Sequence, residues 1–294
     1  MEAVVGGVLD NTDRAVVVDG GSFGHRFRQL LELHGIPNEA IELSDGEVLK
    51  IEHLNRCKTE HPTSILVNIH ETSTGILYDA EMLARFSREH DSLLVFDAIS
   101  SFLADPLDMS QLGVDVVITG SQKALACPPG ISIVVLSPRA IERVRNVAST
   151  SMYLDLESML DNGVRGQTPF TPAVTTILQI HQRLKNLEVV GVEAEIESIA
   201  SRASFFREEA RALPFEMRLE SPSNAATYCT CEFSAKELFT RLKDEYGIWI
   251  CPNGGENADS SFRVGHIGAL KMSDIRLLLA AMHDLQHRGV LHVR

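Results

Sequence analysis

The sequence predicts an α/β fold with a mainly parallel central sheet, covered by helices on both faces and followed by a smaller α+β region. Three observations support this prediction. Six short apolar runs rich in β-branched residues fall within the first 140 residues, and amphipathic stretches separate several of them. Beyond that point the pattern becomes helical, and the last part of the chain mixes short strand patterns with helical ones.

The six apolar runs are RAVVVDGG, EAIEL, SILVNIHET, SLLVFDAI, VDVVITGS and GISIVVLS. Each is nearly continuous in apolar residues, which is typical of parallel strands buried on both faces. Stretches such as FRQLLELHG and DAEMLARFSREH place apolar residues at helical spacing. Strands that alternate with helices in this way predict crossover units and a parallel sheet.

From about residue 140 the chain is helical in pattern, with a loop at DNGVRGQTPFTPAV and one long predicted helix over residues 175–213. The end of the chain carries the strand patterns TYCTCEF, IWICP and SFRVGHIG and two helical patterns. We therefore predict a large domain with its connecting helix over 1–190 and a small α+β domain over 191–294.

Composition excludes several classes of partner. The net charge is −13, with 27 basic and 40 acidic side chains, which argues against nucleic acid or an anionic membrane. No apolar run reaches the ~18 residues of a membrane span, and the start of the chain lacks a signal-peptide pattern, so the sequence predicts a cytoplasmic protein. The five cysteines and eleven histidines show no metal-ligand spacing, so we predict no metal site.

Four polar motifs follow four of the predicted strands: DGGSFG, HETSTG, DAISS and GSQK. Ligands of open parallel sheets bind outside the carboxyl ends of the strands. The four motifs therefore predict a binding site at one edge of the sheet.

Two charged residues stand at such strand ends. Lys123 lies in TGSQKALACPPG, and an amine that is partly neutralised by its surroundings can form a Schiff base with a carbonyl cofactor. Asp97, in LLVFDAISS, could hold a pyridine nitrogen protonated. The alternatives are a surface lysine, and an aspartate that caps a helix or pairs with a base.

The segments HETSTGILYD, VFDAISSFLADPLDM, GVDVVITGSQKALACPPGISIVVLS and SFRVGHIG, in this order, resemble the class V aminotransferases. These are pyridoxal-phosphate (PLP) enzymes of fold type I, and the resemblance is greatest to alanine–glyoxylate, serine–glyoxylate and 2-aminoethylphosphonate–pyruvate transaminases. The resemblance implies ping-pong transfer of an amino group from a small donor (alanine, serine or 2-aminoethylphosphonate) to a 2-oxo acid such as glyoxylate or pyruvate.

The resemblance also implies roles for five residues around the cofactor. Lys123 matches the lysine that binds PLP and moves the proton, and Asp97 matches the partner of the pyridine nitrogen. Phe23 matches an aromatic ring stacked on the cofactor, although a phenylalanine after a strand is often only part of the core. Thr72 matches a hydroxyl that bonds the ring oxygen, and Gln122 matches a polar neighbour of the phosphate.

Two further residues follow from the same resemblance. Thr171 matches a threonine that reaches the phosphate in the partner subunit, which implies a homodimer; its alternative role is a helix N-cap. Arg263 matches the arginine that binds the substrate carboxylate, for which a planar guanidinium is well suited. By itself, an arginine at a strand end is usually a solvated surface residue.

Two other functions stay open at this level. In the family, a glycine- and hydroxyl-rich turn that binds phosphate precedes a helix resembling MEAVV, with which this chain begins. We therefore expect the first strand, the turn and the N-terminal arm to be missing, which allows a catalytically silent truncated homologue. A class V lyase or cysteine desulfurase is the other alternative, but these relatives generally have a histidine where Gln122 stands.

Overall fold

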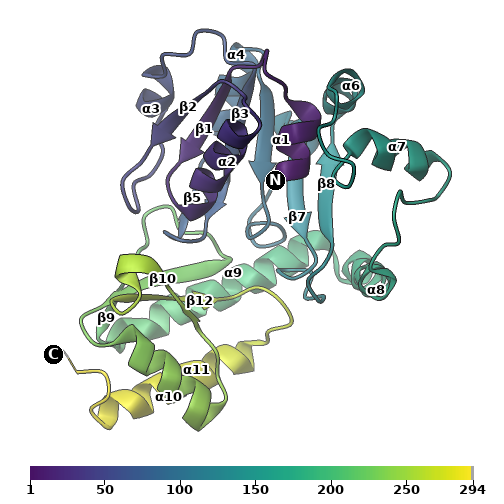
Figure 1. The fold of residues 1–294 in the computed structure, drawn as a ribbon. Coiled ribbons are helices and arrows are strands. Elements are labelled where there is room, and N and C mark those ends of the chain that lie inside the picture. Colours follow the sequence, from purple (N-terminus) through teal and green to yellow (C-terminus); the bar gives the residue numbers. More distant parts are fainter. Residues whose placement is uncertain (293–294) are drawn as a thin grey trace.

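The computed structural model describes residues 1–292, and its larger part is built on a six-stranded sheet in the order β2-β1-β3-β6-β7-β8 (Figure 1). Five strands are parallel, and β8 runs antiparallel to β7. The predicted mainly parallel sheet is confirmed, and each of the six apolar runs forms one strand. The bounds are β1 (Ala15–Asp19), β2 (Asn38–Glu42), β3 (Ser64–Asn68), β6 (Leu93–Asp97), β7 (Val116–Gly120) and β8 (Ser132–Leu136).

Helices cover both faces of this sheet because side chains alternate along each strand. In β1, Val17 packs on one face, whereas Val16 and Val18 pack on the other. The face of Val17 is covered by α1 (Glu2–Val8), α2 (Ser22–Leu33), α6 (Pro138–Asn146) and α7 (Leu156–Val164). The opposite face is covered by α3 (Ile51–Asn55), α4 (Ala80–Glu89) and α5 (Met109–Leu112).

The C-terminal part contains a four-stranded antiparallel sheet in the order β11-β12-β10-β9. Its own core lies between this sheet and the helices of the same region. The α+β character predicted for the end of the chain is confirmed. The elements are β9 (Phe215–Met217), β10 (Ala226–Cys231), β11 (Cys251–Pro252), β12 (Ser261–Gly265), α10 (Ala235–Tyr246), α11 (Met272–His287) and the 3-10 helices η1 (Ala210–Ala212) and η2 (Gly255–Asn257). A separate hairpin pairs β4 (His70–Glu71) with β5 (Ile76–Leu77).

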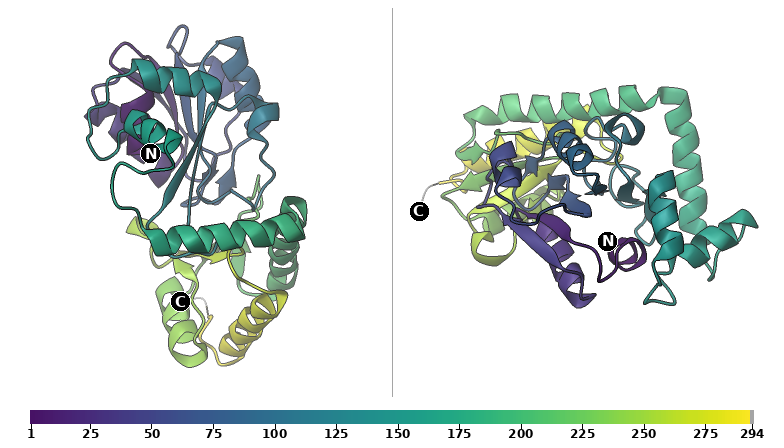
Figure 2. Two further views of the ribbon diagram at one scale, coloured as in Figure 1. Left: turned by 90° about the vertical axis from the view of Figure 1, so that its right-hand side faces the viewer. Right: turned by 90° about the horizontal axis from the view of Figure 1, so that it is seen from above.

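The single long helix predicted over 175–213 is wrong. The segment forms two helices, α8 (Val174–Val190) and α9 (Val192–Glu209), which meet at a corner (Figure 2). Gly191 stands at the corner with φ +93°, a conformation that side chains disfavour. The two-domain division at 190/191 stays a prediction, and we propose this glycine as the boundary. Within residues 1–292, no helix combines the length and the hydropathy that a membrane span requires.

Gly24 offers a test of how tightly α2 packs on the sheet. A Cβ at this position would collide with the carbonyl oxygen of Val18 in β1. We expect Gly24→Ala to lower the free energy of unfolding by about 1–3 kcal/mol, measured by urea denaturation. The matched control is Gly163→Ala in α7, where the added Cβ meets open space and should raise stability by about 0.5–1 kcal/mol. Equal stability of the two variants would contradict this packing.

Candidate active site

Four polar motifs meet at the carboxyl ends of the neighbouring parallel strands β1, β3, β6 and β7, as predicted. The strand register pairs Asn68 with Asp97, and Asp97 with Ile118. β6 therefore ends at Asp97, while β7 continues to Gly120 before the turn that contains Lys123. The aspartate and the lysine thus follow adjacent strands at the same edge of the sheet.

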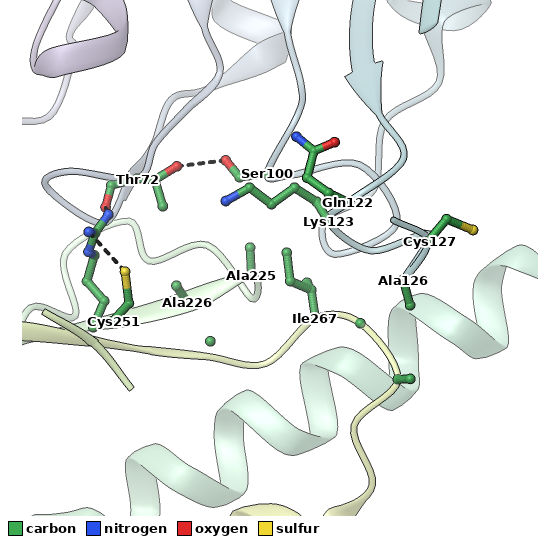
Figure 3. A pocket seen from close by; sticks show the side chains of 14 residues that line it. Thr72, Ser100, Gln122, Lys123, Ala126, Cys127, Ala225, Ala226, Cys251 and Ile267 are labelled. Carbon is green, nitrogen blue, oxygen red and sulfur yellow. Dashed lines mark hydrogen bonds between the residues drawn. The ribbon is translucent and has the colours of Figure 1, made fainter. Parts of the chain in front are cut away.

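A cavity of about 380 Å³ lies between this edge and the C-terminal sheet (Figure 3). It brings together four of the predicted site residues: Thr72, Gln122, Lys123 and Arg263. The side chain of Lys123 extends across the cavity from the loop that follows β7, toward the end where Thr72 lies (Figure 3). The N-terminal and the C-terminal part of the chain therefore both contribute residues to the lining of this cavity.

Hydrogen bonds within the loop hold Lys123 in place. Ser121 Oγ donates to the carbonyl of Pro128 over 2.7 Å, and Cys127 N donates to the carbonyl of Ser121 over 2.9 Å. Ala126 N closes a turn on the carbonyl of Lys123 itself. Among the side chains that the structure describes, none is a hydrogen-bond or ion-pair partner of Lys123 Nζ. The loop therefore presents this amine to the cavity without a recorded partner among the described residues.

Arg263, on β12, is oriented by contacts from both parts of the molecule. Its Nη1 donates to the carbonyl of Thr72 over 3.1 Å. Its Nη2 lies 3.1 Å from Cys251 Sγ and 3.3 Å from the carbonyl of Pro252. Its Nε is buried and lacks a partner among the described residues. A positioned planar cation with spare donors is well suited to bind a carboxylate.

Two hydroxyl groups meet between these charged residues. Thr72 Oγ1 and Ser100 Oγ lie 2.9 Å apart, and Ser100 Oγ also donates to the carbonyl of His70 over 3.3 Å. Because a hydroxyl both donates and accepts, this pair can reorient toward an oxygen of a bound ligand.

Asp97 is buried at the end of β6, and its Oδ1 accepts a hydrogen bond of 2.9 Å from Ile99 N. Burial raises the pKa of Asp97, although the bond from Ile99 acts in the opposite direction. The alternative of a helix N-cap is wrong, because no helix begins at this point. No side-chain donor among residues 1–292 satisfies Oδ2, so this carboxylate retains an acceptor for a buried cationic group.

Phe23 lies in the first turn of α2, which Glu71 holds in place. Glu71 is buried, and its Oε2 accepts from the backbone N–H groups of Phe23 (3.2 Å) and Gly24 (3.0 Å). A carboxylate at a helix N-terminus is favoured by the helix dipole. The Phe23 ring carries the guanidinium of Arg26 at 5.0 Å from its centroid. The structure places Phe23 and Asp97 outside the residues that line the cavity.

Thr171 also lies outside the cavity, exposed in the segment before α8. The N-cap residue of α8 is Ala173, which makes no side-chain cap. The alternative of Thr171 as the N-cap is therefore wrong, and its role in a partner subunit stays a prediction. Gln122 is exposed and lines the cavity beside Lys123.

The model of the family described as "Aminotransferase class-V" matches residues 3–258 of this chain. The chain belongs to the class-V aminotransferases. It is 29% identical to the soluble hydrogenase small subunit of Synechococcus sp. (strain PCC 6716), over 96% of this chain and 76% of the relative. It is 30% identical to the 2-aminoethylphosphonate–pyruvate transaminase of Vibrio vulnificus (strain CMCP6), over 98% of this chain and 80% of the relative.

The fold of this class-V aminotransferase is shared with solved structures. The alanine–glyoxylate aminotransferase of Nostoc sp. superposes with a TM-score of 0.91 at 24% identity, covering 97% of this chain and 78% of that structure. Enzymes of this family are PLP-dependent transaminases of fold type I. The fold class, the family and the cofactor predicted from the sequence are therefore confirmed.

The residues at the strand ends fit PLP. Binding of this cofactor requires an amine for its aldehyde and an anion for its pyridine nitrogen. Lys123 supplies an amine without a partner among the described residues, and Asp97 supplies a buried carboxylate with an unused oxygen. The two groups follow adjacent strands at one edge of the sheet, with Lys123 in the cavity and Asp97 outside the residues that line it.

Three residues near the site were not predicted from the sequence. Ser100 belongs to the DAISS motif and could have been found from its place after Asp97. Cys251 could not, because β11 is only two residues long and its pairing with Arg263 depends on the C-terminal sheet. His70 is fully buried with both ring nitrogens unpaired among the described residues, and no periodic pattern indicates this.

A second buried histidine makes stability depend on pH. Burial lowers the pKa of His266 to about 3, whereas an unfolded histidine titrates near 6.5. Between these values the unfolded chain binds a proton that the folded chain does not, so the free energy of unfolding falls as pH falls. We expect His266→Gln to reduce this slope by up to about 1.4 kcal/mol per pH unit.

The measurement is urea denaturation of both proteins from about pH 7 down to about pH 5, the range in which an unfolded histidine takes up its proton. The comparison of slopes cancels the contribution of other groups, such as His70, whose pKa burial also lowers to about 3. Identical slopes for wild type and variant would show that His266 takes up its proton equally in both states.

Proposed function

We propose that this chain transfers the amino group of a small donor (alanine, serine or 2-aminoethylphosphonate) to glyoxylate or pyruvate, as a homodimer in the cytoplasm. The observation that carries the proposal is an amine, Lys123, that shares one cavity with a positioned guanidinium, Arg263. Lys123 is the group that binds a carbonyl cofactor and can move a proton, and the guanidinium of Arg263 is complementary to the acidic group of a donor or acceptor. Five free cysteines support a reducing compartment.

Lys123, Asp97, Phe23, Thr72 and Gln122 would hold PLP, which supplies an aldehyde that condenses with amines and a ring that takes up an electron pair. Asp97 stabilises positive charge on the ring nitrogen, since its carboxylate is buried and retains a free acceptor. Lys123 Nζ would accept a proton from the amine-bearing carbon of the donor and would donate it back as the amino group is transferred. The same steps in reverse serve the 2-oxo acid.

Arg263 binds the acidic group of each substrate, which is the carboxylate of alanine, serine or the 2-oxo acid, or the phosphonate of 2-aminoethylphosphonate. Its contacts with the Thr72 carbonyl and Cys251 fix the guanidinium before substrate arrives, so little ordering entropy is lost on binding. The reacting carbon is then placed beside Lys123. One site for an acidic group can thus serve both half-reactions, which is compatible with ping-pong kinetics.

The experiment that tests this function is a donor–acceptor screen of the PLP-loaded protein. Alanine is paired with glyoxylate, whereas serine and 2-aminoethylphosphonate are each paired with glyoxylate and with pyruvate, and the amino acid product is quantified by mass spectrometry. Parallel double-reciprocal plots for the best pair support ping-pong transfer. Absence of amino transfer in all five pairs would contradict the proposal.

A homodimer is supported by exposed apolar side chains on α7, α8 and the preceding loop. Met152, Val164 and Leu178 are 84%, 86% and 62% exposed. Apolar surface gathered in this way is typical of an interface. The segment also includes Thr171, for which we propose contact with the cofactor phosphate in the partner subunit.

We expect Leu178→Glu to convert the dimer to a monomer, because burying an unpaired carboxylate in an apolar interface is costly. Light scattering after size exclusion should then give 32.4 kDa in place of twice that mass. The control is Leu33→Glu on α2, where an apolar residue that is even more exposed, at 74%, stands outside this surface. A monomeric wild-type protein, or a variant that stays dimeric, would refute this interface.

A further inference from the structure

A second cavity, of about 600 Å³, adjoins the cavity that Lys123 enters. It lies between α8, α9, the loop after Lys123 and the segment 268–271. The two cavities share Ala126, Cys127, Gly268 and Ala269, so only this rim separates them. Ala126 and Cys127 lie at the opposite end of the first cavity from Thr72 and Cys251 (Figure 3). Arg263, which contacts both of these last residues, is therefore at the far end.

The second cavity is rich in hydrogen-bond donors. Arg183, Arg202 and Lys271 line it, together with the amide side chains of α8. The carboxylate among these lining residues is that of Glu195, which forms an ion pair of 2.6 Å with Arg183 Nη2. In a chain whose net charge is −13, this is a local concentration of positive charge. Such a cluster attracts anions rather than cations.

The guanidinium of Arg202 has one nitrogen without a hydrogen-bond acceptor among the described residues. Its side chain comes from α9 and is only 5% exposed. Nε donates to the carbonyl of His266 and Nη1 donates to Ser198 Oγ, both over 3.0 Å. Nη2 is buried and has no acceptor among the described residues. Arg183 Nε is likewise buried without an acceptor among them. Arginine does not lose its charge in proteins, so these donors require an acceptor.

We propose that the second cavity is an oxyanion site, in which Arg202 and Arg183 donate to a phosphate, phosphonate or carboxylate group. Its place beyond the rim suits the far acidic group of a substrate that carries two anionic groups, and equally a free oxyanion. Binding of the far acidic group of a substrate rests on the proposed function. The oxyanion site itself rests only on the geometry of the second cavity. The site is distinct from Arg263, which lies at the other end of the first cavity.

Calorimetric titration tests the site directly. The protein is first loaded with PLP, so that the phosphate of the cofactor is already in place, and is then titrated with inorganic phosphate and with methylphosphonate. We expect binding by the wild type and at least about tenfold weaker binding by Arg202→Gln, which corresponds to about 1.4 kcal/mol. Arg211→Gln, which removes an exposed arginine paired with Glu208, is the charge-matched control and should bind as the wild type does.

Arg202 is buried, so Arg202→Gln must first be shown to fold by circular dichroism and thermal melting. Arg183→Gln is the second variant, because Arg183 is less buried and its loss also leaves Glu195 to repel an anion. Its binding of phosphate should weaken at least as much. Absence of binding by the wild type, or binding that neither variant weakens, would overturn the proposal.

Kinetics with two donors distinguish the sources of the oxyanion. Aspartate carries a second carboxylate and alanine does not. A KM that rises in Arg202→Gln for aspartate alone identifies the far acidic group of the donor. Unchanged KM values for both donors, together with lost phosphate binding, identify a free oxyanion. An equal rise for both donors would count against the site, since alanine has no group to place there. Absence of turnover with any donor contradicts the proposed function and leaves the titration unaffected.

Discussion

Lys123→Ala is expected to lower the kcat of amino transfer by about 10²–10⁴-fold, the contribution of a positioned general base, and further through loss of the cofactor linkage. Lys123 Nζ is the amine that the loop presents to the cavity, and nothing among the other described lining residues can replace it. The measurement is the rate of product formation with the best donor–acceptor pair. Borohydride treatment of the wild type, followed by peptide mass spectrometry, should place the reduced PLP on Lys123.

The control for this experiment is Lys236→Ala, which removes an exposed lysine from α10 and should retain full activity. Fixation of PLP at another lysine would show that the assignment of Lys123 as the cofactor-binding amine is wrong. No fixation at any lysine would favour the silent homologue considered in the sequence analysis. In that case the family assignment would stand, but the proposed activity would not.

Arg263→Gln is expected to raise KM for both the amino donor and the 2-oxo acid by about 100-fold, or about 2.7 kcal/mol. A guanidinium that binds a carboxylate through two charge-assisted hydrogen bonds provides at least this much. Arg263→Lys should recover only part of the loss, since an ammonium keeps the charge without the planar pair of donors. Steady-state kinetics with each substrate varied in turn measure both effects.

The same arginine variants should affect kcat less than KM, because the carboxylate is bound in the ground state as well as in the transition state. Arg211→Gln serves as the control for loss of one positive charge. Unchanged KM values in Arg263→Gln would remove Arg263 from the substrate site. A fall in kcat alone would instead indicate that the guanidinium acts only in the transition state.

The central sheet was predictable because its four inner strands, β1, β3, β6 and β7, are buried, which leaves a nearly continuous apolar run for each of them. Polar residues at the strand ends then identified Asp97 and Lys123, since in parallel sheets these ends share one edge. The corner at Gly191 was not predictable in this way. The helical pattern continues through VVGVEAEI, and a single glycine in a helical pattern is commonly tolerated.

Long-range contacts account for the rest of what the sequence left open. The bond from Arg263 to the carbonyl of Thr72 spans 191 residues, and only the complete fold brings the two together. Cys251 reaches Arg263 through a strand of two residues, too short to leave a periodic signal. The resemblance to the class-V aminotransferases identified Arg263 by its motif, but not what orients its side chain.

The C-terminal sheet has a consequence for how accurately this protein must fold. Arg263 faces the cavity because β12 pairs with β10 and β11 in one particular register, with Arg263 opposite Tyr228 and Cys251. Neighbouring side chains on a strand point to opposite faces, so a shift of one residue would turn the guanidinium away from the cavity. Residues far from Lys123 in the sequence, along three short antiparallel strands, therefore determine whether Arg263 faces the cavity that Lys123 enters.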